Sequence, residues 1–564
     1  MAVTCLKSPH STARIMAQEF KLKDVTSLNL KNGEKKEVEV EGVEGGKVLL
    51  LKVQDQVHAT SSTCTHYGAP LAKGVLTPEG RLTCPWHGAC FSVATGDVED
   101  APALDPISKY EVFERDGAVY IKTDEATLKA NRRVLNLKCS SVSDEQVLVI
   151  GGGSGTLGAV EGLRGGGYTG KITVVSKEGY QPIDRTKLSK ALLADLSKAA
   201  WRQKDFYKDA KIDFVEGEVS GVDFSSKKVS TKSGKDFDYS KLVLATGGTP
   251  NWLPLDGLKG DLGNVFLLRT LPDTQNILKA VGDNGKKIVV VGSSFIGMEV
   301  GNCLAGMKND VTVIGMEEEP MERVMGKKVG KIFRGLLEKN GVKFKMGASV
   351  EKATPSKSDS SKVGAVHLKD GTTLEADLVI EGVGVKPATE YLKENSAITL
   401  EKDGSIKTDE SFAVDGLKDV YAIGDIATYP YHGPGGNGAP VRIEHWNVAQ
   451  NAGRSVANSI NNPGAKPKPF IPVFWSALGS QLRYCGNTAA SGYDDVVLQG
   501  DIEKPSFVAY YTKGDQVVAV ASMMKDPYMT QSAELMRRNK MPGKAELQKG
   551  IDIMEIGMPS EIKI

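Results

Sequence analysis

Two glycine-rich turns, each preceded by a short apolar run, constrain the fold of this chain more than any other feature. Residues 147–150 (Val-Leu-Val-Ile) lead into Gly151-Gly152-Gly153, and residues 288–291 lead into Gly292 about 140 residues later. A helical stretch and a second β-branched run follow each turn, the latter at 172–175 and at 311–314. Short, wholly apolar runs are typical of strands buried in a parallel sheet. The repeat predicts two βαβ units whose glycine turns admit a pyrophosphate to the start of a helix.

A second pattern, near the N-terminus, pairs cysteine with histidine. Cys64-Thr65-His66 is followed after seventeen residues by Cys84-Pro85-Trp86-His87, so that each half offers one thiolate and one imidazole. Zinc sites that use two Cys and two His usually take Cys-x-x-Cys and then His-x-x-x-His. One Cys and one His from each loop instead fit a Rieske [2Fe–2S] cluster, with both cysteines on one iron and both histidines on the other. We predict the Rieske cluster, and a mononuclear zinc site is the alternative.

The flanks of the two loops resemble those of Rieske domains in Gly68, Pro70, Gly74, Gly88, Phe91 and Gly96. High-potential respiratory Rieske proteins carry a second cysteine in each loop and a Ser and a Tyr after the second loop. The corresponding positions here hold Ala69, Trp86, Ala89 and Phe91. Fewer hydrogen bonds leave the reduced cluster less stabilised, so we expect a reduction potential near about −150 mV, the lower end of the Rieske range.

The length and patterning predict several domains. At ~150 residues per domain, 564 residues suggest three to four. Alternating apolar and polar residues with frequent turns predict a small antiparallel β domain over 19–123, and the prolines at 467, 469 and 472 introduce a separate C-terminal region. We expect a multidomain chain: an all-β Rieske domain at 19–125, a linker at 126–144, two α/β dinucleotide-binding domains, at 145–267 with 377–463 and at 268–376, and a C-terminal α+β domain at 464–564.

Composition excludes some classes of protein. The 71 basic and 70 acidic residues nearly cancel, which argues against nucleic-acid binding by bulk charge. No apolar run approaches ~18 residues, so we predict no transmembrane helix. The first residues contain Lys7, His10 and Arg14 with no acid before Glu19, which is read as a disordered tail or as a weak mitochondrial presequence. The expected compartment is the cytoplasm or the mitochondrion, with reduced thiols, and a homodimer is compatible with the sequence.

The segment 182–190, Pro-Ile-Asp-Arg-Thr-Lys-Leu-Ser-Lys, resembles the P-Y-x-R-P-P-L-S-K segment of the ferredoxin reductase and apoptosis-inducing factor flavoproteins. Residues 245–247, 269–271, 421–425 and 444–446 resemble further segments of this family. The order of a Rieske domain and then a flavoprotein of the pyridine-nucleotide-disulfide-oxidoreductase type is that of the apoptosis-inducing factor 3-like proteins. The resemblance covers roughly residues 20–530.

The resemblance implies that the α/β domain at 145–267 and 377–463 binds FAD and that the α/β domain at 268–376 binds NAD(P)H. Asp425 is expected at the flavin ribityl chain or pyrophosphate, Arg185 at FAD, and Val219 at the adenine through its backbone. Glu178, just past the second predicted strand, is placed to bind a ribose hydroxyl. The residues predicted to bind FAD are Gly151, Gly153, Ser154, Glu178, Arg185, Lys190, Val219, Asp425, Glu444, His445, Trp446 and Trp475, with the 444–446 segment along the isoalloxazine.

The second βαβ unit is expected to bind NADH or NADPH through Gly292, Ser294, Gly297, Glu317 and Gly384. The resemblance places Phe295 over the flavin and Glu299 at the nicotinamide carboxamide, and it implies a Lys190–Glu299 ion pair near flavin N5, so that Lys190, Glu299 and Phe295 form the predicted catalytic set. NADH-binding relatives end the second strand with an acid where this chain has Gly315. No Arg or Lys replaces that acid, and Glu317 lies two residues further on, so we expect NADH with weak discrimination against NADPH.

No cysteine falls in the flavin-contacting motifs, so thiol reduction at the flavin is not expected. We therefore predict an oxidoreductase that passes electrons from NAD(P)H through FAD to the cluster and on to an external acceptor, which is unidentified and is either a small molecule or a protein. One alternative is the reductase component of a Rieske oxygenase. Another is a redox-sensing or pro-apoptotic signalling flavoprotein whose NAD-bound state controls partner binding.

Overall fold

A computed structural model describes residues 18–135, 137–139 and 143–559. The chain divides into two compact units, the first made of residues up to 135 apart from the loop tip at 86–88, the second of the remainder. The predicted N-terminal tail or presequence lies outside the described residues. Among the residues described, no helix is long and apolar enough to be a candidate membrane span.

The first unit is built from two antiparallel sheets, as the alternating pattern predicts. The larger sheet has the order β1-β10-β9-β4-β3-β2, and its apolar face buries residues such as Leu50, Val119 and Ile121. The smaller sheet has the order β5-β6-β7-β8 and carries the two Cys/His loops at its ends. The strands are β1 (Gln18–Lys21), β2 (Lys35–Glu39), β3 (Lys47–Val53), β4 (Gln56–Ser61), β5 (Val75–Leu76), β6 (Arg81–Thr83), β7 (Cys90–Ser92), β8 (Val98–Asp100), β9 (Lys109–Arg115) and β10 (Ala118–Thr123).

The predicted linker at 126–144 is partly structured. Helix α1 (Glu125–Ala130) begins after Asp124, whose carboxylate accepts the Thr127 backbone N–H at 2.8 Å and so caps the helix. Strand β11 (Ser143–Ile150) begins before the predicted domain boundary at 145. Polar composition indicated a linker here, but a single capping aspartate suffices to start a short helix.

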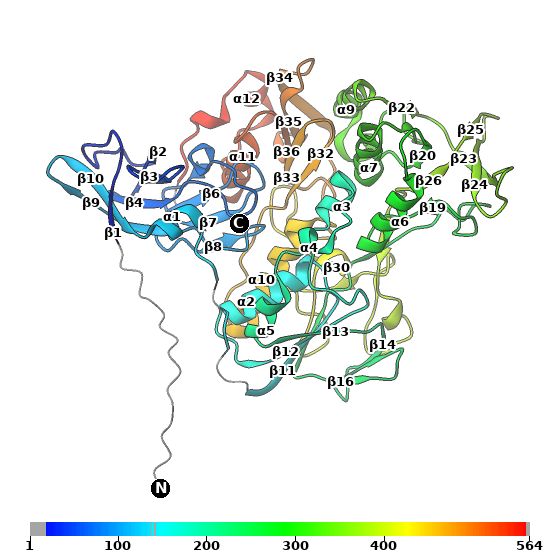
Figure 1. The fold of residues 1–564 in the computed structure, drawn as a ribbon, viewed down its shortest axis with the longest axis horizontal. Coiled ribbons are helices and arrows are strands. Elements are labelled where there is room, and N and C mark those ends of the chain that lie inside the picture. The colour runs from blue at the N-terminus through cyan, green and yellow to red at the C-terminus, as the bar shows by residue number, and fades with distance from the viewer. Residues whose placement is uncertain (1–17, 136, 140–142, 560–564) are drawn as a thin grey trace, which may run out of the picture. The chain divides into compact units, whose positions relative to one another are not determined.

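The second unit contains the two predicted βαβ units. The first parallel sheet has the order β13-β12-β11-β17-β29, and α2 and α10 pack against each other beside it (Figure 1). An antiparallel meander, β14-β15-β16, accompanies this sheet. The elements are β11, α2 (Ser154–Gly165), β12 (Gly170–Ser176), α3 (Thr186–Ala191), α4 (Leu196–Ala199), α5 (Lys204–Asp209), β13 (Ile212–Glu216), β14 (Val219–Asp223), β15 (Lys228–Thr231), β16 (Asp236–Asp238), β17 (Lys241–Leu244), β18 (Gly248–Pro250), β27 (Val385–Pro387), β28 (Ile406–Lys407), β29 (Val420–Ala422), β30 (Ala427–Tyr431), β31 (Ala439–Val441) and α10 (Trp446–Asn461).

The second parallel sheet has the order β19-β26-β20-β21-β22 and its own meander, β23-β24-β25. Because β19 and β26 pair with the strands of this sheet, the unit extends beyond the expected bounds of 268 and 376 at both ends. The elements are β19 (Val265–Phe266), α6 (Leu271–Val281), β20 (Lys287–Val291), α7 (Phe295–Gly306), β21 (Asp310–Ile314), α8 (Glu322–Met325), α9 (Lys327–Lys339), β22 (Val342–Lys345), β23 (Val350–Pro355), β24 (Val363–Leu368), β25 (Thr373–Glu375) and β26 (Leu378–Glu381).

The C-terminal part is an antiparallel sheet of order β32-β33-β36-β35-β34 with helices α11 and α12, which confirms the α+β prediction. One apolar cluster joins this sheet to α3, α7 and the second parallel sheet, with Leu188, Met298 and Phe474 among its members. Three separate parts of the chain therefore meet where the predicted flavin residues lie. The elements are β32 (Val473–Ala477), β33 (Gln481–Gly486), β34 (Asp495–Asp501), β35 (Ser506–Lys513), β36 (Gln516–Met523), α11 (Tyr528–Arg537) and α12 (Lys544–Gln548).

Candidate iron and flavin sites

The two Cys/His loops share one backbone geometry. The Cys64 N–H donates to the Ala69 carbonyl at 2.8 Å, and the Cys84 N–H donates to the Ala89 carbonyl at 2.8 Å. Gly68 and Gly88 hold corresponding places with φ of 77° and 73°, a conformation that a side chain disfavours. Each glycine lets its loop turn back tightly after the histidine.

The four predicted ligands are buried, from 1% exposure at Cys84 to 9% at His66. Hydrogen bonding with Cys84, together with burial, raises the pKa of the Cys64 thiol well above its ordinary value, so the two sulfurs are neighbours. Among the described residues, no three His, Cys, Asp or Glu side chains converge as a single ion would require. A Rieske cluster takes two protein ligands on each iron, and this donor set of two thiols and two imidazoles fits it.

A cavity of about 230 Å³ in the second unit collects most of the predicted flavin residues. No cysteine is found among its described lining residues, as the sequence predicts. The predicted residues that line it are Gly153, Ser154, Arg185, Lys190, Phe295, Glu299, Asp425, Glu444, His445, Trp446 and Trp475.

The glycine turn opens this cavity toward the start of α2. Gly151 has φ of 114°, and a Cβ there would lie 2.1 Å from the Ala245 carbonyl oxygen, so only glycine fits. A Cβ on Gly153 would meet nothing within 4 Å, which shows open space before the helix. A helix N-terminus facing open space suits the FAD pyrophosphate.

Two residues that line the cavity, His445 and Trp446, carry polar atoms for a ligand. His445 Nδ1 and Trp446 Nε1 are buried atoms without a hydrogen-bond partner in the structure. Burial lowers the pKa of His445 to about 4, so the ring is neutral at pH 7. Orphaned buried nitrogens of this kind fit a flavin, whose ring carries several hydrogen-bonding atoms.

Asp425 and Glu178, two of the three acids predicted at FAD, are both ion-paired. Asp425 accepts from Arg269 at 2.7 Å, and both residues line the cavity. Glu178 accepts from Arg185 and from the Tyr180 hydroxyl and does not itself line the cavity. Burial opposes ionisation of Glu178, but the Arg185 guanidinium outweighs it and holds the pKa of that carboxyl low. The sequence indicates Arg269 only as part of the family segment 269–271.

The predicted Lys190–Glu299 ion pair is present. Lys190 Nζ lies 2.9 Å from Glu299 Oε1, with 20% of the lysine side chain exposed and 3% of the glutamate. Ser189 and Ser476 also donate to this carboxylate. Ser189 belongs to the family segment 182–190, whereas no sequence pattern indicates Ser476. The ring centroids of Phe295 and Phe474 lie 4.8 Å apart, with the two rings nearly perpendicular.

Other predicted cofactor residues lie away from the flavin cavity. Val219 begins β14, Gly384 lies between β26 and β27, and Glu317 follows β21, where it pairs with Arg323 at 3.2 Å. A Cβ on Gly292 would lie 2.4 Å from the Gly382 carbonyl oxygen, so this second turn also requires glycine. Ser294 precedes α7 as its N-cap, and Gly297 lies in the first turn of that helix.

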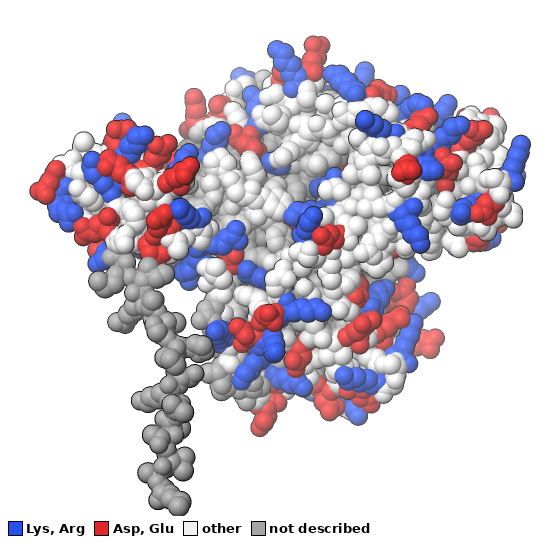
Figure 2. Space-filling view, in the orientation of Figure 1, with Lys and Arg blue, Asp and Glu red and all other residues white. Residues whose placement is uncertain are grey.

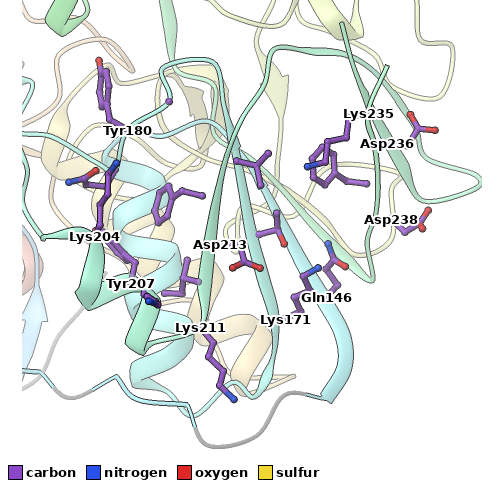
Figure 3. Close-up of a pocket in the computed structure, with 18 residues that line it drawn as sticks. Gln146, Lys171, Tyr180, Lys204, Tyr207, Lys211, Asp213, Lys235, Asp236 and Asp238 are labelled. Atoms are coloured by element: carbon purple, nitrogen blue, oxygen red, sulfur yellow. The ribbon is translucent and has the colours of Figure 1, made fainter. Parts of the chain in front are cut away.

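A larger cavity of about 880 Å³ runs along β13 and contains none of the predicted cofactor residues. Its walls come from α5, β12, β13 and β16, and Figure 3 shows Lys171, Lys204, Lys211 and Lys235 around it. Strand β13 is the edge of its sheet, and lysines beside a sheet edge keep it solvated. Figure 2 likewise shows acidic and basic side chains interspersed on the visible face.

Family models match three parts of the chain: a Rieske [2Fe-2S] domain at 20–111, a pyridine nucleotide-disulphide oxidoreductase at 145–453, and a reductase C-terminal domain at 473–554. Fold and sites together define an NAD(P)H-dependent flavoprotein oxidoreductase that carries FAD and a Rieske cluster and passes electrons through them to an external acceptor. The Rieske match sets aside the zinc alternative.

The most similar relatives include apoptosis-inducing factor 3 of Homo sapiens, which is 38% identical over 528 residues, 92% of this chain and 84% of that protein. Putidaredoxin reductase of Pseudomonas putida is 32% identical over 407 residues, 70% of this chain and 92% of that one. The crystal structure of the covalent putidaredoxin reductase–putidaredoxin complex matches with a TM-score of 0.67 at 29% identity, covering 73% of this chain and 98% of the other. The chain belongs to the pyridine nucleotide-disulphide oxidoreductase family and, within it, to the apoptosis-inducing factor 3 group.

Proposed function

We propose that this chain takes a hydride from NADH at the Lys190–Glu299 side of the flavin cavity and delivers electrons to an external acceptor protein. When bound, FAD accepts two electrons as a hydride and releases them singly, and the cluster carries one. The observation that carries the proposal is the buried ion pair in a cavity whose described lining includes no cysteine. The similar putidaredoxin reductase, whose crystal structure is a covalent complex with putidaredoxin, supports a protein as the acceptor.

Each residue of the cavity has a distinct part in this proposal. Arg185 and Arg269, each paired with a carboxylate, line the same cavity as Gly153 and supply guanidinium donors to a pyrophosphate. The neutral His445 ring and the Phe295–Phe474 pair exclude water from the isoalloxazine region. The Lys190 ammonium, which is paired with Glu299, is the hydrogen-bond donor expected near flavin N5.

Anaerobic stopped-flow mixing of the full-length holoprotein with NADH tests the proposal. We expect the flavin absorbance to bleach rapidly and the cluster absorbance to fall afterwards. Slow flavin reduction that leaves a persistent flavin–NAD charge-transfer band would instead favour the signalling alternative and contradict the proposal.

The cluster potential is a second measurable property. Ala69, Ala89 and Phe91 are buried, and their side chains carry no hydroxyl or thiol that could donate to the cluster. We expect a midpoint near about −150 mV by spectroelectrochemistry, since hydrogen bonds to the cluster are what raise Rieske potentials. A midpoint above zero would show that other groups stabilise the reduced form.

The expected coenzyme preference follows from Gly315, which stands where NADH-binding relatives have an acid, and from its neighbour Ser293. A Cβ on Gly315 would lie 2.4 Å from Ser293 Oγ and 2.6 Å from Met346 Cε, so the usual acid at this position is sterically excluded by Ser293. Glu317 is the remaining carboxylate for a ribose, and we expect NADH to be favoured by about tenfold, the value of one charge-assisted hydrogen bond.

Coenzyme kinetics of two variants check this. Gly315→Glu alone is expected to lower kcat/KM for NADH about tenfold because of the clash. The double change Ser293→Gly with Gly315→Glu should recover NADH turnover and raise the NADH-to-NADPH ratio above that of the parent. A double variant as poor as the single one would show that Ser293 is not the obstacle.

A further inference from the structure

The carboxylate of Glu299 is the meeting point of three separate parts of the chain. Its Oε1 accepts from Lys190 Nζ at 2.9 Å and from Ser476 Oγ at 2.5 Å, and its Oε2 accepts from Ser189. The lysine and Ser189 belong to α3, Glu299 to α7, and Ser476 to β32. A carboxylate this buried is tolerated only when both of its oxygens are satisfied, which this arrangement achieves.

Strand β32 is well placed to control this carboxylate. Phe474 and Ser476 are two residues apart, so their side chains leave the same face of the strand. Phe474 contacts the Phe295 and His445 rings at 4.8 and 4.5 Å, and Ser476 is 2% exposed. One face of strand β32 therefore contacts the Phe295 and His445 rings through Phe474 and the Lys190–Glu299 ion pair through Ser476.

The terminal torsion of a glutamate is soft, so its carboxylate turns unless hydrogen bonds fix it. Lys190 and Ser476 both contact Oε1 of Glu299. The serine hydroxyl therefore helps to set the position of the oxygen that Lys190 contacts. Without Ser476, Oε1 keeps only the Lys190 contact and Oε2 only the Ser189 hydrogen bond, so the orientation of the carboxylate is fixed less firmly.

We propose that Ser476 is a positioning residue for hydride transfer, which acts through Glu299 by fixing the carboxylate that holds Lys190 in the flavin cavity. The C-terminal domain then completes the active site rather than only packing against it. This inference rests on the proposed function, because it concerns the same ion pair and the same flavin reduction.

The test compares Ser476→Ala, Ser476→Thr and Ser522→Ala in the full-length FAD-loaded protein. Ser522 is a matched control, since it is a buried serine of the same sheet whose hydroxyl, unlike that of Ser476, has no hydrogen-bond partner among the described residues. We expect Ser476→Ala to slow flavin reduction at saturating NADH about tenfold, which equals 1.36 kcal/mol of activation free energy, with KM changed less than about twofold. FAD content should be unaltered, and Ser476→Thr, which keeps the hydroxyl, should recover most of the rate.

A double-mutant cycle separates positioning from general packing. If Ser476 acts through Glu299, then Ser476→Ala in a Glu299→Gln background should add little further loss. The proposal is overturned if Ser476→Ala reduces at the parent rate, if Ser522→Ala loses as much, if threonine fails to rescue, or if the two losses simply multiply. Parent protein that NADH does not reduce would contradict the proposed function itself, whereas normal reduction in both parent and Ser476→Ala contradicts only this inference.

Discussion

Replacing Cys84 with alanine is expected to abolish the [2Fe–2S] cluster while NADH still reduces the flavin. Cys84 is 1% exposed, its sulfur neighbours that of Cys64, and no other cysteine of the described chain belongs to the two loop motifs. Losing one of two thiolates leaves an iron without the ligand set that holds a Rieske cluster. Iron content per chain and the electron paramagnetic resonance signal after reduction should both fall to background.

Cys90→Ala provides the matched control for this change. Cys90 is fully buried in β7, a few residues from Cys84, and its sulfur accepts a hydrogen bond from Thr83 Oγ1 at 3.5 Å. It should keep its iron and its signal. Full iron content in Cys84→Ala, or equal loss in Cys90→Ala, would contradict the assignment of the ligands.

The second large effect is expected from Glu299→Ala. Removing the carboxylate leaves the Lys190 ammonium, only 20% exposed, without its partner. Breaking a buried pair in this way is costly, and the orientation of Lys190 in the flavin cavity is lost with it. We expect kcat/KM for NADH to fall about a hundredfold, roughly 2.7 kcal/mol of transition-state stabilisation, with a larger change in KM than in FAD content.

Steady-state kinetics with NADH and the flavin absorbance of the purified protein measure the two quantities separately. Glu338→Ala removes an exposed glutamate of α9 and should leave both unchanged. Unaltered kinetics in Glu299→Ala would refute its role at the nicotinamide. Loss of FAD together with activity would instead assign Glu299 to the stability of the flavin domain.

The local patterns predicted the elements closely. The buried runs at 147–150 and 288–291 are central strands of two parallel sheets, and the glycines after them adopt φ values of 114° and 110°. Strand periodicity concerns neighbouring residues and can be recognised without the tertiary structure. The steric need for glycine at 151 and 292 comes instead from carbonyl oxygens of the distant residues Ala245 and Gly382. The predicted bounds of the second α/β domain, 268 and 376, were less accurate, because strands β19 and β26 of its sheet lie outside them and outside the βαβ repeat.

The motifs also placed Lys190 and Glu299 together, through resemblance rather than through periodicity, and the structure confirms the pair. The segment 182–190 includes Ser189 but does not indicate its bond to Glu299, and Ser476 could not be found in this way at all. A serine carries no spacing signal, and its contribution depends on which distant carboxylate it meets when the domains pack. The same is true of the ion pair between Arg269 and Asp425, which lie 156 residues apart in the chain.

The sequence alone predicted the fold class from local periodicity and the cluster ligands from the spacing of one motif, and its resemblance to a known family implied the FAD and NAD(P)H sites. The tertiary structure decided which side chains share the flavin cavity, that Glu178 pairs with Arg185, and that Ser293 and Met346 crowd the space beside Gly315. It also brought a C-terminal strand to the buried carboxylate of Glu299. These outcomes depend on the convergence of distant segments, and hydrogen bonds and steric contacts between such segments leave no period or spacing in the sequence.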